Sequence, residues 1–131
     1  MVCVVDTCGW IEWLTDGVLA AEFEPQLENL SDVCIPTVIQ FELYKWVKRE
    51  RGEARALEVA ALTEQGNVVP LHTAISLLAA DFALQYGLSF ADAVIYATAQ
   101  HLEVGLVTAD EHFKGLPGVV YFDKKLNLRR E

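Results

Sequence analysis

The chain has 131 residues, 53% of them hydrophobic, and a formal net charge of −9. This length predicts one domain, spanning residues 1–131, and the lack of any run of about 18 apolar residues excludes a transmembrane helix. The acidic charge argues mildly against a tightly binding nucleic-acid module, but it does not argue against an enzyme whose bound metal ions supply positive charge.

A buried strand is expected at the start of the chain. Val2–Val5 is a short, continuous apolar run, typical of a strand covered on both faces, and Asp6 follows it directly. A helix with Trp10 and Trp13 on one stripe is expected next, with Thr7 placed to cap it. The stripe indicates either a core face or a partner surface, for which large aromatic side chains are good anchors.

The rest of the chain alternates between helical and strand patterns. The helical stretches are Val18–Leu30, Thr37–Arg51, Glu53–Glu64, Thr73–Tyr86, Ser89–Leu102 and the single turn Asp110–Lys114. The strands are Val33–Ile35, Asn67–Pro70, Gly105–Thr108 and Val119–Phe122. Capping boxes at Thr37 and Ser89 indicate helix starts, and Gly52 and Gly87 indicate helix ends. The alternation predicts an α/β fold: a central, mostly parallel sheet of four to five short strands, covered by helices on both faces.

Acidic side chains are expected to gather at one edge of this sheet. Asp6 directly follows the first strand, Asp110 lies two residues beyond the Gly105–Thr108 strand, and Asp92 opens a helix that can reach the same edge. In an open parallel sheet, ligands bind outside the carboxyl ends of the strands. Glu42 lies inside a helix among apolar neighbours, so it reaches that edge only if its helix packs there.

Each acid also has a purely structural interpretation. Asp92 is placed as a capping-box acid, Asp110 suits the positive end of a helix, and Asp6 suits a turn. Glu42 also fits a solvated helix face. Together, however, such carboxylates raise one another's pKa and cost stability unless a cation neutralises them. The pattern therefore favours a cation site.

The chemistry of the acids indicates a hard cation. Oxygen ligands suit Mg²⁺ or Mn²⁺ rather than zinc, and His72, His101 and His112 show no ligand-like spacing. Ions of this kind acidify water and clamp the attacking and leaving oxygens of a phosphodiester. The expected reaction is hydrolysis.

Four motifs closely resemble, in order and spacing, the acidic motifs of PIN-domain nucleases. They are Val4–Thr7, Ile39–Leu43, Ser89–Ala93 and Leu106–Asp110. The last two motifs are the most specific. A sequence rarely contains by chance Asp-Ala at the start of an apolar helix followed by Val-Thr-x-Asp. In length and layout the chain is similar to VapC toxins, the ribonuclease halves of bacterial and archaeal toxin–antitoxin pairs. The resemblance implies a single PIN-like domain and an endoribonuclease that uses Mg²⁺ or Mn²⁺.

The same resemblance implies roles for individual residues. The metal ligands would be Asp6, Glu42, Asp92 and Asp110. Thr108 and Thr7 would be polar helpers that bind metal-bound water or fix a carboxylate, although Thr108 also fits a plain helix cap. Glu111 is expected to cap a helix rather than act as a further acid, and Asp81, in the middle of a helix, is expected to be solvated.

Partners and location follow from the resemblance and from the cysteines. VapC similarity implies an RNA substrate, a cognate antitoxin and a homodimer. Cys3, Cys8 and Cys34 lie among apolar residues and are expected to be small buried thiols, which suits a cytoplasmic protein without a membrane segment. Two alternatives stay open: a PIN-like scaffold that binds RNA or a protein without cleavage, and a PIN nuclease in RNA processing outside a toxin–antitoxin system.

Overall fold

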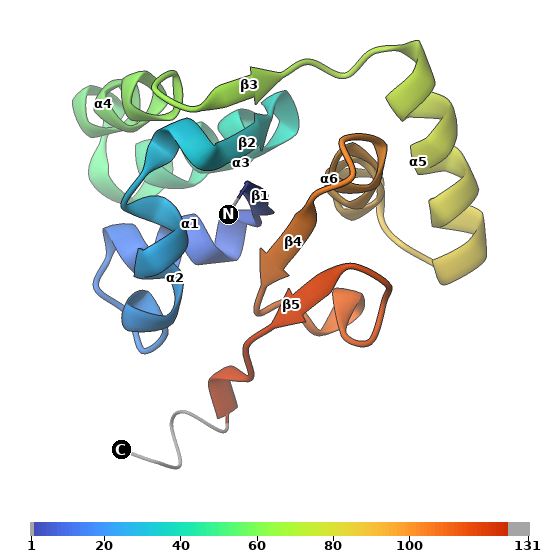
Figure 1. Ribbon diagram of the computed structural model, residues 1–131. Helices are drawn as coiled ribbons and strands as arrows, with labels where there is room; N and C mark the ends of the chain where they lie inside the picture. Colours follow the sequence, from blue (N-terminus) through green and yellow to red (C-terminus); the bar gives the residue numbers. More distant parts are fainter. Residues whose placement is uncertain (1, 126–131) are drawn as a thin grey trace.

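A five-stranded, fully parallel sheet lies at the centre of the computed structural model, which describes residues 2–125. Its strands are β1 (Cys3–Val5), β2 (Val33–Pro36), β3 (Asn67–Val69), β4 (Gly105–Thr108) and β5 (Val119–Tyr121). Their order across the sheet is β3-β2-β1-β4-β5, so the first strand lies in the middle (Figure 1). The predicted α/β fold with a parallel sheet is confirmed.

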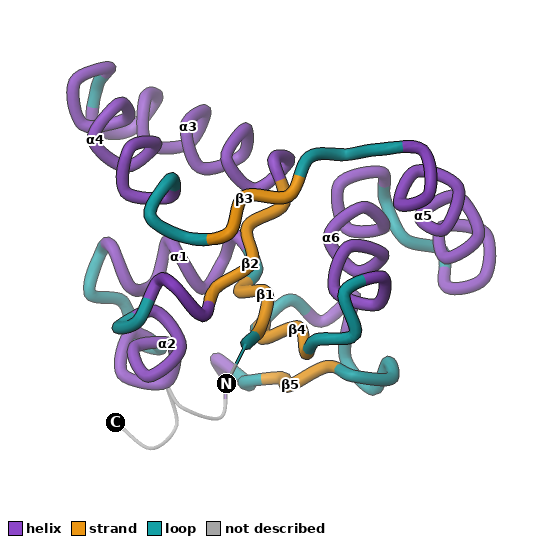
Figure 2. Tube along the Cα trace, turned by 45° about the horizontal axis from the view of Figure 1, so that its top comes forward, coloured by secondary structure: helices purple, strands orange, loops and turns teal. Residues whose placement is uncertain are grey.

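Helices cover both faces of the sheet. They are α1 (Thr7–Leu14), α2 (Ala20–Leu27), α3 (Thr37–Arg51), α4 (Glu53–Thr63), α5 (Thr73–Tyr86) and α6 (Phe90–His101), with short 3₁₀ turns η1 (Leu30–Asp32) and η2 (Glu111–Phe113). Figure 2 shows α1 to α4 on one side of the sheet and α5 and α6 on the other. Because α6 contacts β1, β2 and β4, it is the central helix of its layer.

The core lies between the central strands and α6. All three residues of β1 are fully buried, and so are Leu106 and Val107 of β4. The segment Ala93–Ala99 of α6 is buried throughout. A continuous apolar run is therefore needed in each of these elements, and the site described below lies at the carboxyl ends of these buried strands.

Two of the expected N-caps are wrong, although α3 spans Thr37–Arg51 as expected. The N-cap of α1 is Asp6 rather than Thr7, because the Asp6 carboxylate accepts a hydrogen bond from the Thr7 backbone N–H. The N-cap of α3 is Pro36, and the side chain of Gln40 reaches α4 instead of closing a capping box. The Thr7 hydroxyl donates to Glu42 of α3 instead, so in both helices a contact between distant residues takes a side chain that a local pattern would assign to capping. The second helix is also shorter than expected, since Leu30 begins η1.

Between residues 2 and 125, none of the helices is by itself long and apolar enough to cross a membrane. Only α5 and α6 taken together pass that test of length and composition, and they are bent by 116° at their junction.

Candidate functional site

Asp6 lies at the carboxyl end of the central strand, where hydrogen bonds from Thr7 and Thr108 hold its carboxylate. Its backbone N–H donates to the Val107 carbonyl (3.0 Å), which continues the β1–β4 pairing by one residue. The Thr7 backbone N–H donates to Oδ1 (2.8 Å), and the Thr108 hydroxyl donates to Oδ2 (2.8 Å). With 4% of its surface exposed, Asp6 is a buried acid in a fixed orientation.

Burial makes the ionised form of Asp6 costly. It raises the pKa of Asp6 from 3.8 to about 7, although the hydrogen bonds from Thr108 and Thr7 oppose the shift. The negative charges of Asp92 and Asp110 raise it further. None of the lysines and arginines between residues 2 and 125 forms an ion pair with these three acids. Their joint ionisation near pH 7 therefore calls for a cation.

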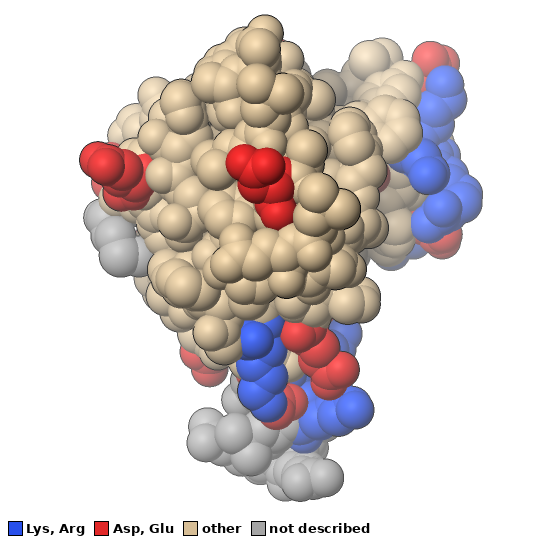
Figure 3. All heavy atoms as spheres, turned by 90° about the vertical axis from the view of Figure 1, so that its right-hand side faces the viewer, with Lys and Arg blue, Asp and Glu red and all other residues tan. Residues whose placement is uncertain are grey.

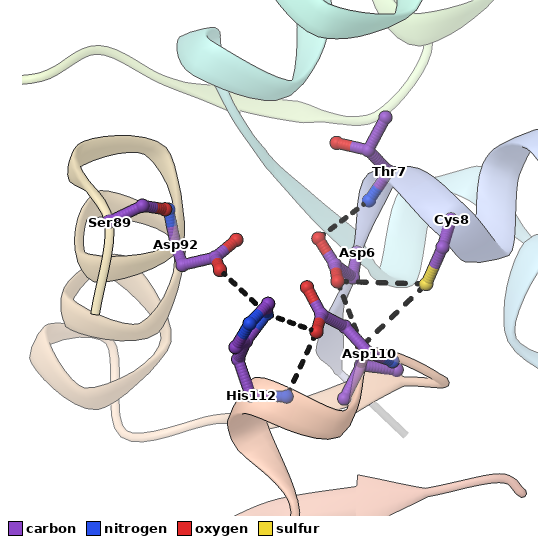
Figure 4. A network of polar contacts seen from close by, with 8 residues as sticks. Asp6, Thr7, Cys8, Ser89, Asp92, Asp110 and His112 are labelled. Carbon is purple, nitrogen blue, oxygen red and sulfur yellow. Dashed lines mark hydrogen bonds and ion pairs between the residues drawn. The ribbon is translucent and has the colours of Figure 1, made fainter. Parts of the chain in front are cut away.

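Asp110 and Asp92 face each other from two different elements (Figure 4). Asp110 caps η2 by accepting from the His112 backbone N–H (2.9 Å), and its own N–H donates to Thr108 Oγ1 (2.9 Å). Asp92 lies in the first turn of α6, where its N–H donates to the Ser89 hydroxyl (3.4 Å). Burial and the charge of Asp110 raise the pKa of Asp92. The two carboxylates therefore share one electrostatic environment.

The loop before α6 places Asp92 at this edge. Gly87 adopts a φ of 67°, in the left-handed region, which ends α5 and lets the chain turn back toward the sheet. Ser89 then caps α6 as the sequence predicts. Asp92 has both the capping-box position and a place beside Asp110, so the structural and the functional interpretation of this residue are compatible.

Glu42 reaches the site through a contact between distant parts of the chain. The Thr7 hydroxyl donates to Glu42 Oε1 (2.6 Å), which joins α1 to α3 directly beside Asp6. The charge of Glu42 also contributes to the raised pKa of Asp92. The structure thus brings all four predicted acids together, and two threonines connect them: Thr7 links Asp6 to Glu42, and Thr108 links Asp6 to Asp110.

Among the other candidates, Thr108 is fully buried and is not the cap of η2, since Asp110 fills that position. Its place beside Asp6 agrees with the alternative role, that of fixing a carboxylate. Glu111 is exposed and lies 3.7 Å from the ammonium group of Lys125. Asp81 is exposed on α5, as expected for a solvated helix position.

Cys8 belongs to the site, which sequence reasoning missed. The expectation of a small buried thiol fits Cys3 and Cys34, whereas Cys8 is half-buried. Its Sγ lies 3.6 Å from Asp6 Oδ2 and 3.6 Å from Thr108 Oγ1. Burial and the charge of Asp6 raise the pKa of Cys8 to about 12, so the thiol stays neutral. The sequence feature that could have indicated this role is the position of Cys8, two residues after Asp6 at the end of the first strand.

His112 was also missed, because its partners are carboxylates rather than other histidines. Its Nδ1 lies 2.7 Å from Asp110 Oδ1 and 3.6 Å from Asp92 Oδ2. The charge of a protonated His112 lowers the pKa of Asp92. The signal in the sequence was its place two residues after Asp110.

The donor set of this site suits a divalent metal ion. The carboxylates of Asp6 after β1, Asp92 in α6 and Asp110 before η2 interact electrostatically, the first of them is buried, and each keeps lone pairs beyond the hydrogen bonds described above. Hard divalent cations take oxygen ligands of this kind. Asp92, Asp110 and His112 each offer a ligand atom, and these three atoms lie within 4.8 Å of one another.

Comparisons with known proteins agree on one family. The family model of the PIN domain matches residues 3–119. A toxin–antitoxin complex from Klebsiella pneumoniae contains a chain that is 27% identical, with a TM-score of 0.74, covering 90% of this chain and 95% of that chain. A search of curated protein sequences finds no match.

Two further solved structures share the fold at lower identity. A DNA-bound VapBC from Salmonella typhimurium has a TM-score of 0.73 at 18% identity, covering 95% of this chain and 98% of that chain. A VapC from Mycobacterium tuberculosis, described as a sarcin–ricin loop cleaving toxin, has a TM-score of 0.65 at 16% identity, covering 95% of this chain and 93% of that chain.

Proposed function

The chain belongs to the PIN-domain family, and on that basis we propose that it is a metal-dependent endoribonuclease and the toxin of a VapBC-type pair. The observation that carries the proposal is the buried Asp6 carboxylate, fixed by Thr7 and Thr108 beside Asp92 and Asp110 with no Lys or Arg partner in the described part of the chain. The similarity to a toxin–antitoxin chain and to a VapC that cleaves RNA supports the activity.

Asp6, Glu42, Asp92 and Asp110 would hold the metal, which we propose to be Mg²⁺ or Mn²⁺. Such an ion, when bound, supplies positive charge to the reacting phosphate and acidifies water. The protein's own contribution is orientation. Thr108 keeps one Asp6 oxygen in place, and the Thr7 hydroxyl holds Glu42. Hydrogen bonds of this kind fix ligand geometry before substrate arrives.

The test compares RNA cleavage by the wild type with that by two variants carrying the same chemical change. Asp92→Asn removes a charge from the site and is expected to lower cleavage at least 100-fold, in line with the loss of electrostatic groups in other active sites. Asp16→Asn makes the same change at an exposed residue of the turn after α1 and is expected to leave the rate unaltered. Equal rates in all three proteins would contradict the proposal, and a wild type that binds RNA without cutting it would support the scaffold alternative.

The side of the site next to Glu42 offers contacts for RNA phosphates. A pocket of about 280 Å³ is lined by Thr7, Ile11, Phe41, Glu42, Lys45, Trp46 and Arg49. Lys45 lies over the exposed ring of Phe41, 5.6 Å from its centre. Cations next to exposed aromatic rings are the combination that single-stranded nucleic acid favours. We propose that Lys45 and Arg49 contact phosphates there.

Replacing both Lys45 and Arg49 by Ala should therefore weaken the salt dependence of RNA binding. Two lost phosphate contacts correspond to a slope of log K against log salt that is shallower by about 1.4. A matched control replaces Lys48 and Arg55 by Ala, a change that removes the same charge at residues that do not line this pocket. Binding is measured by fluorescence anisotropy in the Asp92→Asn background. Equal slopes for the two double variants would exclude a specific phosphate site at this pocket.

We also propose that two copies associate through the face of α5 and α6. Large apolar side chains are exposed there: Leu71, Leu77, Leu84 and Phe90. The space-filling view shows that this side is largely uncharged, with an acidic patch near its centre (Figure 3). A face of this kind marks an interface more often than free surface. Light scattering of the purified chain should give twice the monomer mass, and a monomer at micromolar concentration would exclude the dimer.

The proposed antitoxin partner and cytoplasmic location rest on other observations. The Klebsiella pneumoniae structure is a toxin–antitoxin complex, which supports an antitoxin as the second partner. The three cysteines are free, as is usual in a reducing compartment. If a small protein encoded beside this chain is the antitoxin, adding it should suppress RNA cleavage, and undiminished cleavage would argue against the pairing.

A further inference from the structure

His112 is held against the two acids although most of it is exposed. Its side chain is 75% exposed, so hydration would ordinarily keep the ring in water. Instead both its backbone N–H and its Nδ1 lie against Oδ1 of Asp110, at 2.9 and 2.7 Å. Figure 4 shows the ring between Asp110 of η2 and Asp92 of α6. Exposed ion pairs contribute little by themselves, so the placement of the ring has to be explained by its surroundings.

The spacing of the three side chains is that of metal ligands. Neighbouring ligands of a six-coordinate ion with bonds of about 2.1 Å lie roughly 3 Å apart. The distances from Nδ1 to the carboxylate oxygens of Asp110 and Asp92 are 2.7 and 3.6 Å, on either side of that value. The ligand atoms of all three residues lie within 4.8 Å of one another. An ion between them would need only small side-chain adjustments.

We propose that Nδ1 of His112 is a ligand of the ion held by Asp92 and Asp110, and that it shifts the preference of the site from Mg²⁺ toward first-row transition ions. The inference rests on the proposed metal site and goes beyond it by adding a nitrogen donor. Imidazole binds transition ions well and Mg²⁺ poorly, whereas carboxylates bind both. The four acids alone therefore set no such preference, and His112 does.

A competing role for His112 gives the opposite result. If the ring is only a cation that pairs with the carboxylates, it occupies the place of the metal, and its removal should raise the affinity for every divalent ion. If the ring is a ligand, its removal should lower the affinity for transition ions and leave Mg²⁺ binding nearly unchanged. The two roles are thus separated by the sign of the effect and by its dependence on the ion.

The experiment measures Co²⁺ and Mg²⁺ binding by calorimetry for the wild type, His112→Ala and His101→Ala. We expect His112→Ala to lower the affinity for Co²⁺ by roughly tenfold or more, because the loss of a residue that only supports a metal ligand already costs about that much. The affinity for Mg²⁺ should change by less than about twofold. His101 is exposed at the end of α6, and its ring packs on His72 instead, so the control variant should behave as the wild type. Because His112 is largely exposed, its removal should leave folding intact.

Pulsed electron paramagnetic resonance of the Mn²⁺-loaded protein gives a second readout that does not depend on activity. Coupling to an imidazole nitrogen is expected in the wild type and in His101→Ala, and should disappear in His112→Ala. Mn²⁺ binding without this coupling, or equal gains of Co²⁺ and Mg²⁺ affinity in His112→Ala, would overturn the inference while leaving the nuclease proposal intact. Failure of the wild type to bind any divalent ion would overturn both.

Discussion

Replacing Asp6 by Asn is expected to abolish metal-dependent RNA cleavage and, at the same time, to stabilise the metal-free protein at neutral and alkaline pH. The carboxylate is 4% exposed and its pKa is raised to about 7, so the folded chain carries the cost of a buried charge once the pH exceeds that value. Asn has nearly the same shape and is a good N-cap for α1. The cleavage rate should fall at least 100-fold because a ligand charge is lost.

The sign of the pH effect follows from the raised pKa. In the unfolded chain the Asp6 carboxyl ionises near pH 4, whereas in the folded chain it stays protonated until about pH 7. The folded state therefore binds more protons over this range, and the stability of the metal-free wild type should fall as the pH rises from about 4 to about 7. The upper bound for this loss is about 4 kcal/mol, since one pKa unit corresponds to about 1.4 kcal/mol. The raised pKa of Asp92 acts in the same direction.

The measurement is urea unfolding at pH 5 and pH 8 in the presence of a chelator. The wild type should be less stable at pH 8, and Asp6→Asn should lose less stability between the two pH values. Asp16→Asn, with the same change at an exposed turn residue, should follow the wild type. Parallel pH profiles for the wild type and Asp6→Asn would show that Asp6 is not the buried acid described here. Adding Mg²⁺ or Mn²⁺ at pH 8 should restore stability to the wild type and to the control variant but not to Asp6→Asn.

The second large effect is expected from Thr108→Val, which keeps the shape of the side chain and removes its hydroxyl. The change deletes the hydrogen bond to Asp6 Oδ2 and leaves the Asp110 backbone N–H without its acceptor. Leaving a buried polar group unpaired costs about 1–3 kcal/mol of unfolding free energy. Because two ligands lose their support together, cleavage should fall by about 10–100-fold.

Thr108→Ser is the matched control. It keeps the hydroxyl and removes only a methyl group, so most of the activity should remain, with a modest loss of stability from the small cavity. Cleavage kinetics and urea unfolding of both variants decide the role of the hydroxyl. If Thr108→Val cleaves RNA like the wild type, or Thr108→Ser is equally impaired, the side chain acts through packing and not by orienting Asp6.

The fold was predictable because its pattern is local. Short apolar runs such as Val2–Val5, separated by helical stretches, require buried strands joined by crossovers, and these force a parallel sheet. The same rule placed Asp6 and Asp110, since a strand-end residue of a parallel sheet lies at the ligand-binding edge. The ends of the helices were less predictable. Asp6 caps α1 in place of Thr7, whose hydroxyl is used by Glu42.

The remaining parts of the site depend on contacts between distant residues. Glu42 joins the site through Thr7, 35 positions away in the chain, and Thr108 reaches Asp6 across 102 positions. No periodicity or capping rule contains this information. Cys8 and His112 were not predicted because neither residue is spaced as a metal ligand from another cysteine or another histidine. Both contact carboxylates instead.

The most direct test of the account is to remove metal from the purified wild type with a chelator and to follow cleavage of a single-stranded RNA as Mg²⁺ or Mn²⁺ is added back. The predicted result is no cleavage by the chelated protein, full recovery as either ion saturates the site, and no recovery in Asp6→Asn at any concentration of metal. Cleavage that persists in the chelated protein, or that returns equally in Asp6→Asn, would contradict the claim that these acids form a metal site for RNA hydrolysis.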